Sequence, residues 1–154
     1  MKAEDIYSKN QNKFWLKNAL IYFRIGKLYE QRGRHQEALR NMTHCVEMLE
    51  KNQKGPTIEK LILYESLGTI LKQIPQNSRA IENYNKAIET QEALNRTDKR
   101  IKIMHYYDKI ADCYKDLKDV KKNLLYMKKA LDLRVKTMEL SPIKLRKSTG
   151  SVDY

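Results

Sequence analysis

The sequence predicts an all-α fold in which pairs of helices repeat along the chain, and three observations carry this prediction. Only 5 glycines and 3 prolines interrupt 154 residues, of which 41% are apolar, as in a globular domain. Apolar residues recur at the three- and four-residue spacing of a helix face. The same residue classes return every 42 or 43 residues, as from Gly26 to Gly68 and on to Ala111, so one structural unit occurs three times.

Seven positions hold one register across the three copies. In each copy a tyrosine precedes a small residue by four positions, and an aliphatic residue comes directly before the small one. The register-matched sets are Tyr22, Tyr64 and Tyr107; Ile25, Leu67 and Ile110; Gly26, Gly68 and Ala111; Tyr29, Leu71 and Tyr114; Ala38, Ala80 and Asn123; Met42, Tyr84 and Met127; and Cys45, Ala87 and Ala130. The small residue is expected where the first helix of a pair approaches the second.

Gly26 lies inside a helical pattern, where glycine costs about 1 kcal/mol relative to alanine. The pair Gly26-Lys27 does not form a phosphate-binding loop, because such a loop follows a strand and its lysine precedes Ser or Thr. Here no strand pattern precedes the glycine, and Leu28 follows the lysine. The close approach of a paired helix is therefore expected to offset the cost of Gly26.

The pattern resembles the tetratricopeptide repeat (TPR) family, whose motif is W-x2-L-G-x2-Y followed by A-x3-F. The first copy reads Y-x2-I-G-x2-Y and then A-x3-M-x2-C; the second reads Y-x2-L-G-x2-L and then A-x3-Y-x2-A; the third reads Y-x2-I-A-x2-Y and then N-x3-M-x2-A. The family period is about 34 residues, and the longer period here resembles kinesin-light-chain-type repeats. The resemblance implies a right-handed α-solenoid of three antiparallel helix pairs.

The breaks between copies predict the domain layout. Residues 1–10 are expected to be an N-terminal extension, residues 11–139 three TPR-like repeats (about 11–54, 55–97 and 98–139), and residues 140–154 a basic C-terminal tail. The expected helices are about 11–32, 35–53, 57–73, 78–95, 99–117 and 119–139.

By the same resemblance, the first helix of each pair lines a concave face that binds a peptide or helix of a partner protein. The candidate groove residues are Phe23, Lys27, Glu30, Glu65, Thr69, Lys72, Asp108, Asp112, Lys115 and Asp116. Some family members use Lys and Asn there as a carboxylate clamp for a peptide C-terminus. Thr69 stands where the clamp needs Asn, so chaperone docking is not expected.

Asp108, Asp112 and Asp116 follow one another at four-residue intervals, which places them on one face of a helix. Two interpretations remain open at this stage. The stripe is a solvated face balanced by nearby lysines, or it forms, with Glu65, an acidic strip that binds a basic segment of a partner.

The last expected helix, 119–139, carries more apolar residues than its own pair can cover. They are Leu124, Leu125, Met127, Leu131, Val135 and Met138. A repeat array needs a polar cap at its end. We expect this face and the basic tail to contact another chain within a larger complex.

The formal net charge of +12 indicates an acidic partner. The leading hypothesis is a non-catalytic scaffold or adaptor that binds other proteins within a larger intracellular assembly, with a cytoskeletal or ciliary setting. The alternative is a nucleic-acid or ribonucleoprotein-binding subunit that uses its basic surface, which a steep salt dependence of affinity would reveal.

Neither an enzyme nor a cofactor or metal site is expected, because His35, His44 and His105 lack catalytic or metal-ligand companions at motif spacing. The sequence shows no secretory leader and no membrane span, since its longest apolar run is residues 19–23. Cys45 and Cys113 lie in apolar helical surroundings and are expected to be buried thiols of a cytoplasmic protein.

Overall fold

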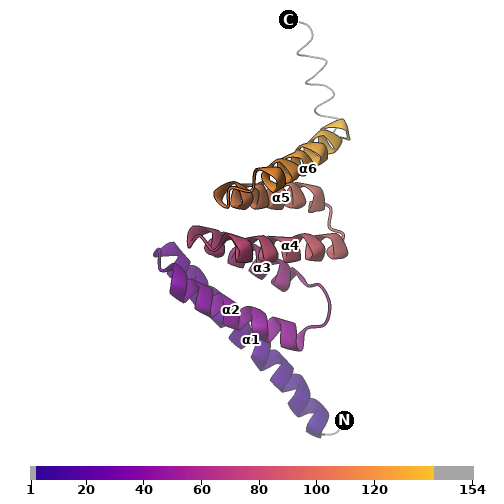
Figure 1. The fold of residues 1–154 in the computed structure, drawn as a ribbon. Helices are drawn as coiled ribbons and strands as arrows, with labels where there is room; N and C mark the ends of the chain where they lie inside the picture. The colour runs from indigo at the N-terminus through magenta and orange to yellow at the C-terminus, as the bar shows by residue number, and fades with distance from the viewer. Residues whose placement is uncertain (1–2, 141–154) are drawn as a thin grey trace, which may run out of the picture. The chain divides into compact units, whose positions relative to one another are not determined.

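The computed structural model describes the backbone of residues 3–140 and the side chains of residues 14–140 (Figure 1). Its regular elements within that range are the helices α1 (Ala3–Gln31), α2 (His35–Asn52), α3 (Ile58–Gln73), α4 (Asn77–Leu94), α5 (Lys99–Asp116) and α6 (Val120–Glu139). The all-α helical repeat fold is thereby confirmed.

The helix bounds agree with the expected ones to within one residue, with one exception. Helix α1 begins at Ala3 instead of about residue 11, so the predicted N-terminal extension is largely helical. The sequence before residue 11 is polar and carries no apolar periodicity that would have predicted a helix. Residues 141–154, which hold nearly all of the predicted basic tail, lie outside the described residues.

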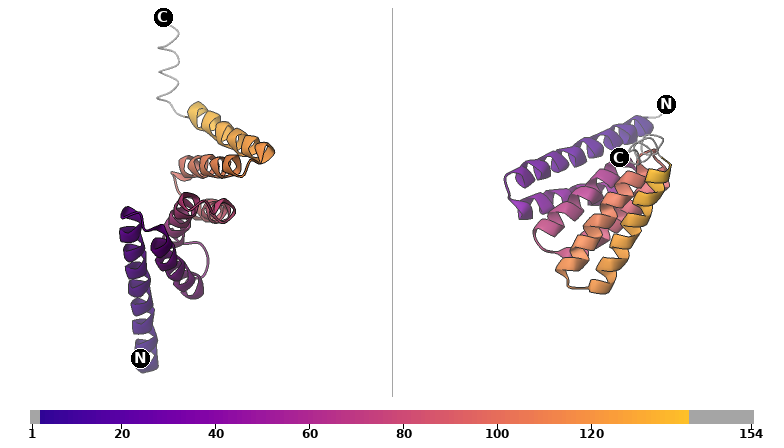
Figure 2. Two further views of the ribbon diagram at one scale, coloured as in Figure 1. Left: turned by 60° about the vertical axis from the view of Figure 1, so that its left-hand side comes forward. Right: turned by 90° about the horizontal axis from the view of Figure 1, so that it is seen from above.

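The helices form two compact units, divided between Leu94 and Asn95. In the first unit, α1 packs on α2, α2 on α3, and α3 on α4; in the second unit, α5 packs on α6. Figure 2 shows the helices of each consecutive pair lying side by side. The first unit therefore contains two helix pairs and the second contains one.

Short turns and local side chains fix where the helices begin and end. Gly33 ends α1 with a φ of +72°, in the left-handed region that glycine adopts without strain. Thr57 caps α3, because its hydroxyl accepts a hydrogen bond from the Lys60 backbone N–H at 3.2 Å. Asp119 caps α6 in the same way through the Lys122 N–H at 3.1 Å.

In the first two pairs, the second helix closely approaches the first at the glycine that identifies the repeat in the sequence. A Cβ atom built on Gly26 would lie 2.7 Å from Met42 Cγ, and one on Gly68 would lie 2.8 Å from Tyr84 Cε1. Both distances are shorter than a nonbonded carbon contact allows. The prediction that these glycines mark a close helix approach is therefore confirmed.

In the third pair, α5 and α6 make their close contact without a glycine. Ala111 replaces glycine and is buried, and Asn123 stands where the other copies have alanine. The Asn123 side-chain amide donates a hydrogen bond to the Ala111 backbone carbonyl at 2.7 Å. The polar residue that departs from the repeat pattern is thus a bridge between α5 and α6.

A second contact between the two helices recurs in all three pairs. It joins the tyrosine that precedes the small residue by four positions to a basic or aromatic side chain. In each case the partner lies 22 positions further along, on the second helix of the pair. The contacts are Tyr22 with His44 (ring centroids 4.4 Å apart), Tyr64 with Lys86 (Nζ 5.5 Å from the ring centroid) and Tyr107 with Lys129 (5.7 Å). These pairs hold the two helices together through edge-on ring and cation–π contacts.

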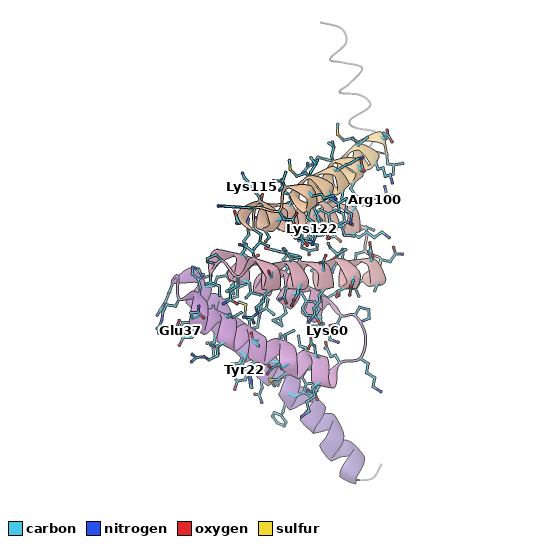
Figure 3. The ribbon with its side chains drawn as sticks, viewed as in Figure 1. Tyr22, Glu37, Lys60, Arg100, Lys115 and Lys122 are labelled. Carbon is cyan, nitrogen blue, oxygen red and sulfur yellow. The ribbon has the colours of Figure 1, made fainter. Side chains whose placement is uncertain are left out.

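Lys60, labelled in Figure 3, holds the loop between α2 and α3. Its side chain is buried, and its ammonium donates hydrogen bonds to the backbone carbonyls of Gln53 at 2.7 Å and Gly55 at 2.8 Å. Such charge-assisted bonds satisfy carbonyls that the end of α2 leaves open. The loop is thereby tied to the first turn of α3.

Replacing Gly26 with leucine should lower the free energy of unfolding by about 3 kcal/mol, because the added side chain overpacks the contact with Met42. Urea unfolding followed by the fluorescence of Trp15, the single tryptophan of the chain, measures this change in α1. The neighbouring variant Lys27→Ala is the control and should change stability by less than about 0.5 kcal/mol, since it removes a partly exposed ion pair with Glu30 and a long contact with the Phe23 ring and overpacks nothing. Equal effects of the two substitutions would contradict the register.

Candidate partner-binding surfaces

Three of the predicted groove residues form a cluster on α1. The Lys27 ammonium makes an ion pair with the Glu30 carboxylate at 3.0 Å and lies 5.9 Å from the centroid of the Phe23 ring. Phe23 and Glu30 are half-buried, and the Lys27 side chain is more exposed. The structure therefore brings an aromatic ring and an ion pair together on one face of α1.

The predicted residues of α3 differ in their surroundings. The Thr69 hydroxyl donates a hydrogen bond to the Glu65 backbone carbonyl at 3.0 Å and lies 3.3 Å from the Tyr84 hydroxyl on α4. Thr69 is therefore engaged in packing α3 against α4. Glu65 and Lys72 are half-buried on the same helix.

A small apolar cavity of about 60 Å³ lies beside Phe23, where α1, α2 and α3 meet. Its lining residues are Leu20, Phe23, Cys45, Leu49, Glu59, Ile62 and Leu63. Leu20 and Ile62 are exposed apolar side chains, so the mouth of the cavity is apolar as well. Burial raises the pKa of the Cys45 thiol to about 11, which keeps this part of the wall uncharged at neutral pH.

Sequence reasoning identified Phe23 and missed the rest of this cavity. A signal was present, because Leu20 and Ile62 are 42 residues apart and occupy the same position of consecutive repeats. An apolar residue at one repeated, exposed position of both helices indicates a shared apolar surface. The remaining lining residues are ordinary core positions and carry no signal of their own.

The second unit carries the acidic stripe on α5. Asp108 accepts a hydrogen bond from the Arg134 guanidinium of α6 at 2.8 Å. Asp112 and Asp116 follow on the same helix face and are exposed, as is Lys115, which Figure 3 labels. The Asp108 carboxylate of the stripe is therefore already engaged by an arginine of its own unit.

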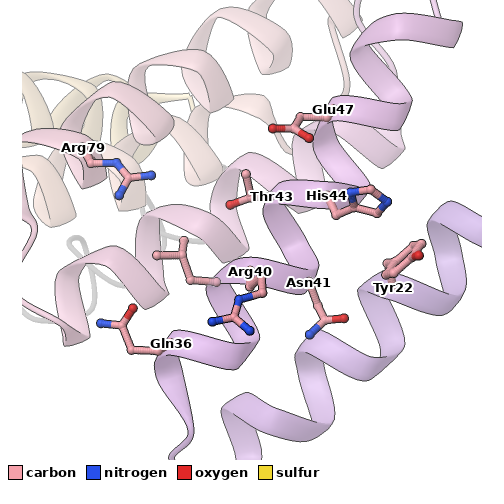
Figure 4. Close-up of a pocket in the computed structure, with 9 residues that line it drawn as sticks. Tyr22, Gln36, Arg40, Asn41, Thr43, His44, Glu47 and Arg79 are labelled. Atoms are coloured by element: carbon pink, nitrogen blue, oxygen red, sulfur yellow. The ribbon is translucent and has the colours of Figure 1, made fainter.

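A larger, polar hollow of about 570 Å³ lies along α2 and was not anticipated from the sequence (Figure 4). Its lining residues are Tyr22, Gln36, Leu39, Arg40, Asn41, Thr43, His44, Glu47 and Arg79. The figure shows His44 facing Tyr22, in the edge-on ring contact that joins α1 and α2.

Three tyrosines of the second unit lie close together. Tyr107, Tyr114 and Tyr126 form a half-buried cluster in the second unit, with ring centroids 5.9 Å apart for the Tyr107–Tyr126 pair and 5.5 Å apart for the Tyr114–Tyr126 pair. Lys122 and Lys129 lie over these rings. Since lysine side chains occupy the ring faces, a nucleobase would have to displace them in order to stack.

Among residues 14–140, no group of three or more His, Cys, Asp or Glu side chains could hold a metal ion. Of the described helices, none has both the length and the apolar character needed to cross a membrane. Cys45 and Cys113 are buried, as predicted.

The chain is similar to known helical-repeat proteins in sequence and in fold. The family model described as tetratricopeptide repeat matches residues 17–93. No curated protein matches the chain. Among solved structures, BtubC (BKLC) from P. vanneervenii is similar with a TM-score of 0.66 at 22% identity, over 77% of this chain and 46% of that one.

Two further solved structures show the same likeness. The N-terminal domain of stress-induced protein-1 from C. elegans has a TM-score of 0.62 at 10% identity, over 88% of this chain and 95% of that one. Kinesin light chain-like TPR repeats from Podosopora anserina have a TM-score of 0.61 at 17% identity, over 81% of this chain and 59% of that one. The chain thus spans under half of BtubC and 59% of the Podosopora chain.

At these identities the solved structures show the fold, and the family model adds the sequence signature. The match over residues 17–93 covers half of the chain and lies within the first unit. The same register continues through Tyr107, Ile110 and Ala111 on α5. The chain belongs to the tetratricopeptide repeat family.

Proposed function

We propose that this chain is a non-catalytic scaffold that binds a peptide or helix of a partner protein within a larger intracellular assembly. TPR proteins bind other proteins, and the family is typically a non-catalytic interaction module. The observation that carries the proposal is the apolar cavity beside Phe23, at the meeting point of three helices. A partner side chain would find both an apolar mouth and a nearby polar cluster there.

The cavity suits the end of an aliphatic side chain. Its volume of about 60 Å³ exceeds the room of a single water molecule, which takes about 30 Å³ of the liquid. An aliphatic side chain that fills it and covers Leu20 and Ile62 would gain about 1.5–3 kcal/mol from burial. Lys27, Glu30 and Glu59 supply the polar rim that orients a bound backbone.

The acidic stripe of α5 supports a preference for basic partners. Asp112 and Asp116 are exposed residues on the same face of this helix. Charges in such rim positions contribute mainly to association rate and partner choice. We propose that they attract lysine or arginine residues of a partner protein, while Asp108 retains its contact with Arg134.

The formal charge of +12 is the observation that favours the second candidate, a nucleic-acid-binding subunit. The lysines over Tyr107, Tyr114 and Tyr126 argue for protein binding, because a nucleobase would have to displace them in order to stack on these rings. The same charge supports a cytoskeletal or ciliary setting, in which the acidic tails of tubulin are a suitable counterpart. A fall in affinity for generic RNA by orders of magnitude on raising the salt concentration would favour the second candidate.

The cavity is tested by charging its mouth. Peptides selected from a random display library against the full chain should carry an aliphatic residue that fills the cavity. Ile62→Glu should weaken their binding by roughly tenfold to a hundredfold, because a carboxylate at the mouth excludes an apolar side chain. Titration calorimetry measures the change. The matched control is Ile58→Glu, which charges an exposed isoleucine of α3 that does not line the cavity; equal weakening by the control would contradict the proposal.

The acidic stripe is tested by reversing its two exposed charges. The double variant Asp112→Lys with Asp116→Lys should lower the affinity of a selected basic peptide by roughly tenfold at low salt, and by less at high salt. Asp108 stays unchanged, so the pair with Arg134 is kept. Fluorescence anisotropy of the labelled peptide measures the affinity.

The matched control for the stripe reverses two exposed charges on another helix, Glu82→Lys with Glu89→Lys on α4. It changes the net charge of the chain by the same amount as the stripe variant. If both variants bind the peptide equally well, the acidic stripe is a solvated face and the proposed basic partner is wrong.

A further inference from the structure

We propose that the outer face of α1 docks on the outer face of α6 of a second copy of this chain, head to tail. Both faces are apolar and exposed. In the register of the repeat, they correspond to the two sides of the interface that α2 and α3 form inside the first unit. This inference concerns surfaces other than the cavity and the acidic stripe.

The outer face of α1 is exposed at positions that the next repeat buries. The side chains of Ile21, Ile25 and Leu28 are between 36% and 57% exposed. Their equivalents 42 residues later on α3, which packs on α2, are at most 4% exposed. These equivalents are Leu63, Leu67 and Ile70. The first helix therefore presents a surface that, one repeat later, is part of the core.

The outer face of α6 is likewise exposed at positions that are buried on α2, the second helix of the first pair. Leu124 and Leu131 are 66% and 55% exposed. Their equivalents 85 residues earlier on α2, Leu39 and Val46, are both only 8% exposed. Helix α6 thus keeps the apolar residues of a second helix of a pair, and in the described structure nothing covers them.

Hollows on the α1 side could receive the side chains of α6. One of about 430 Å³ is lined by Asn18, Ile21, Tyr22, Ile25, His44 and Met48. The next, of about 220 Å³, is formed by Ile25, Leu28, Tyr29 and Arg32. Protruding leucines at helical spacing pack into such hollows when the ridges of one helix enter the grooves of another.

A second copy is the occupant that these observations favour, because one chain carries both complementary faces. The contact would continue the α2–α3 interface from one copy to the next. It is heterologous, so each association leaves one α1 face and one α6 face open for a further copy. The net charge of +12 opposes the contact, and added salt should therefore strengthen it.

The test is the molar mass of the full chain in solution. Sedimentation equilibrium from about 1 µM to about 500 µM, at about 0.15 M and 0.5 M salt, should show masses that rise beyond the dimer and rise further at the higher salt. Leu28→Glu on α1 and Leu131→Glu on α6 should each give a monomer. An equimolar mixture of these two variants should form a one-to-one dimer and nothing larger, because each variant retains one intact face.

Circular dichroism checks that each variant keeps the helical content of the parent chain; if Leu28→Glu loses it, Ile21→Gln on the same face replaces it. The matched control Ile58→Glu should associate like the parent. A parent chain that stays monomeric at every concentration and salt would overturn the proposal. So would a mixture in which the α1 variant pairs only with itself, since that is a symmetric α6 contact, or a control variant that also dissociates.

Discussion

The close approach of the two helices in each pair is the constraint on which the rest of the structure depends. Gly26 against Met42 and Gly68 against Tyr84 leave no room for a Cβ atom, and Ala111 is tied to Asn123 by a hydrogen bond. These contacts fix how the first helix of a pair lies on the second. That placement turns Phe23 and Leu20 toward α3, which forms the apolar cavity, and it turns the other side of α1 outward.

Most of the fold could be predicted because its information is local and repeated. Five of the six helices have the expected bounds, since apolar spacing recurs in each copy and residues such as Gly33, with its positive φ, mark a turn between helices. The start of α1 was wrong, because a polar helix end leaves no periodic pattern. Lys60 also escaped prediction, since its role depends on the path of the loop that it holds.

The candidate site was less predictable than the fold. Family register predicts a groove that includes Phe23, Lys27, Glu30 and Thr69. The structure brings the first three together, and the Thr69 hydroxyl lies beside the Tyr84 hydroxyl of α4. The cavity depends on how three helices meet, and a pattern along one helix does not contain that information. Asp108 shows the same limit, because its partner Arg134 lies on another helix.

The central claim, that close helix approach at the repeated small residue sets the structure, is tested most directly by a double-mutant cycle in urea unfolding. Gly68→Ala places a methyl group against the Tyr84 ring, and Tyr84→Val removes that ring. Gly68→Ala should destabilise the parent chain, and it should cost about 1 kcal/mol less in the Tyr84→Val background. Strictly additive effects of the two substitutions would contradict the account.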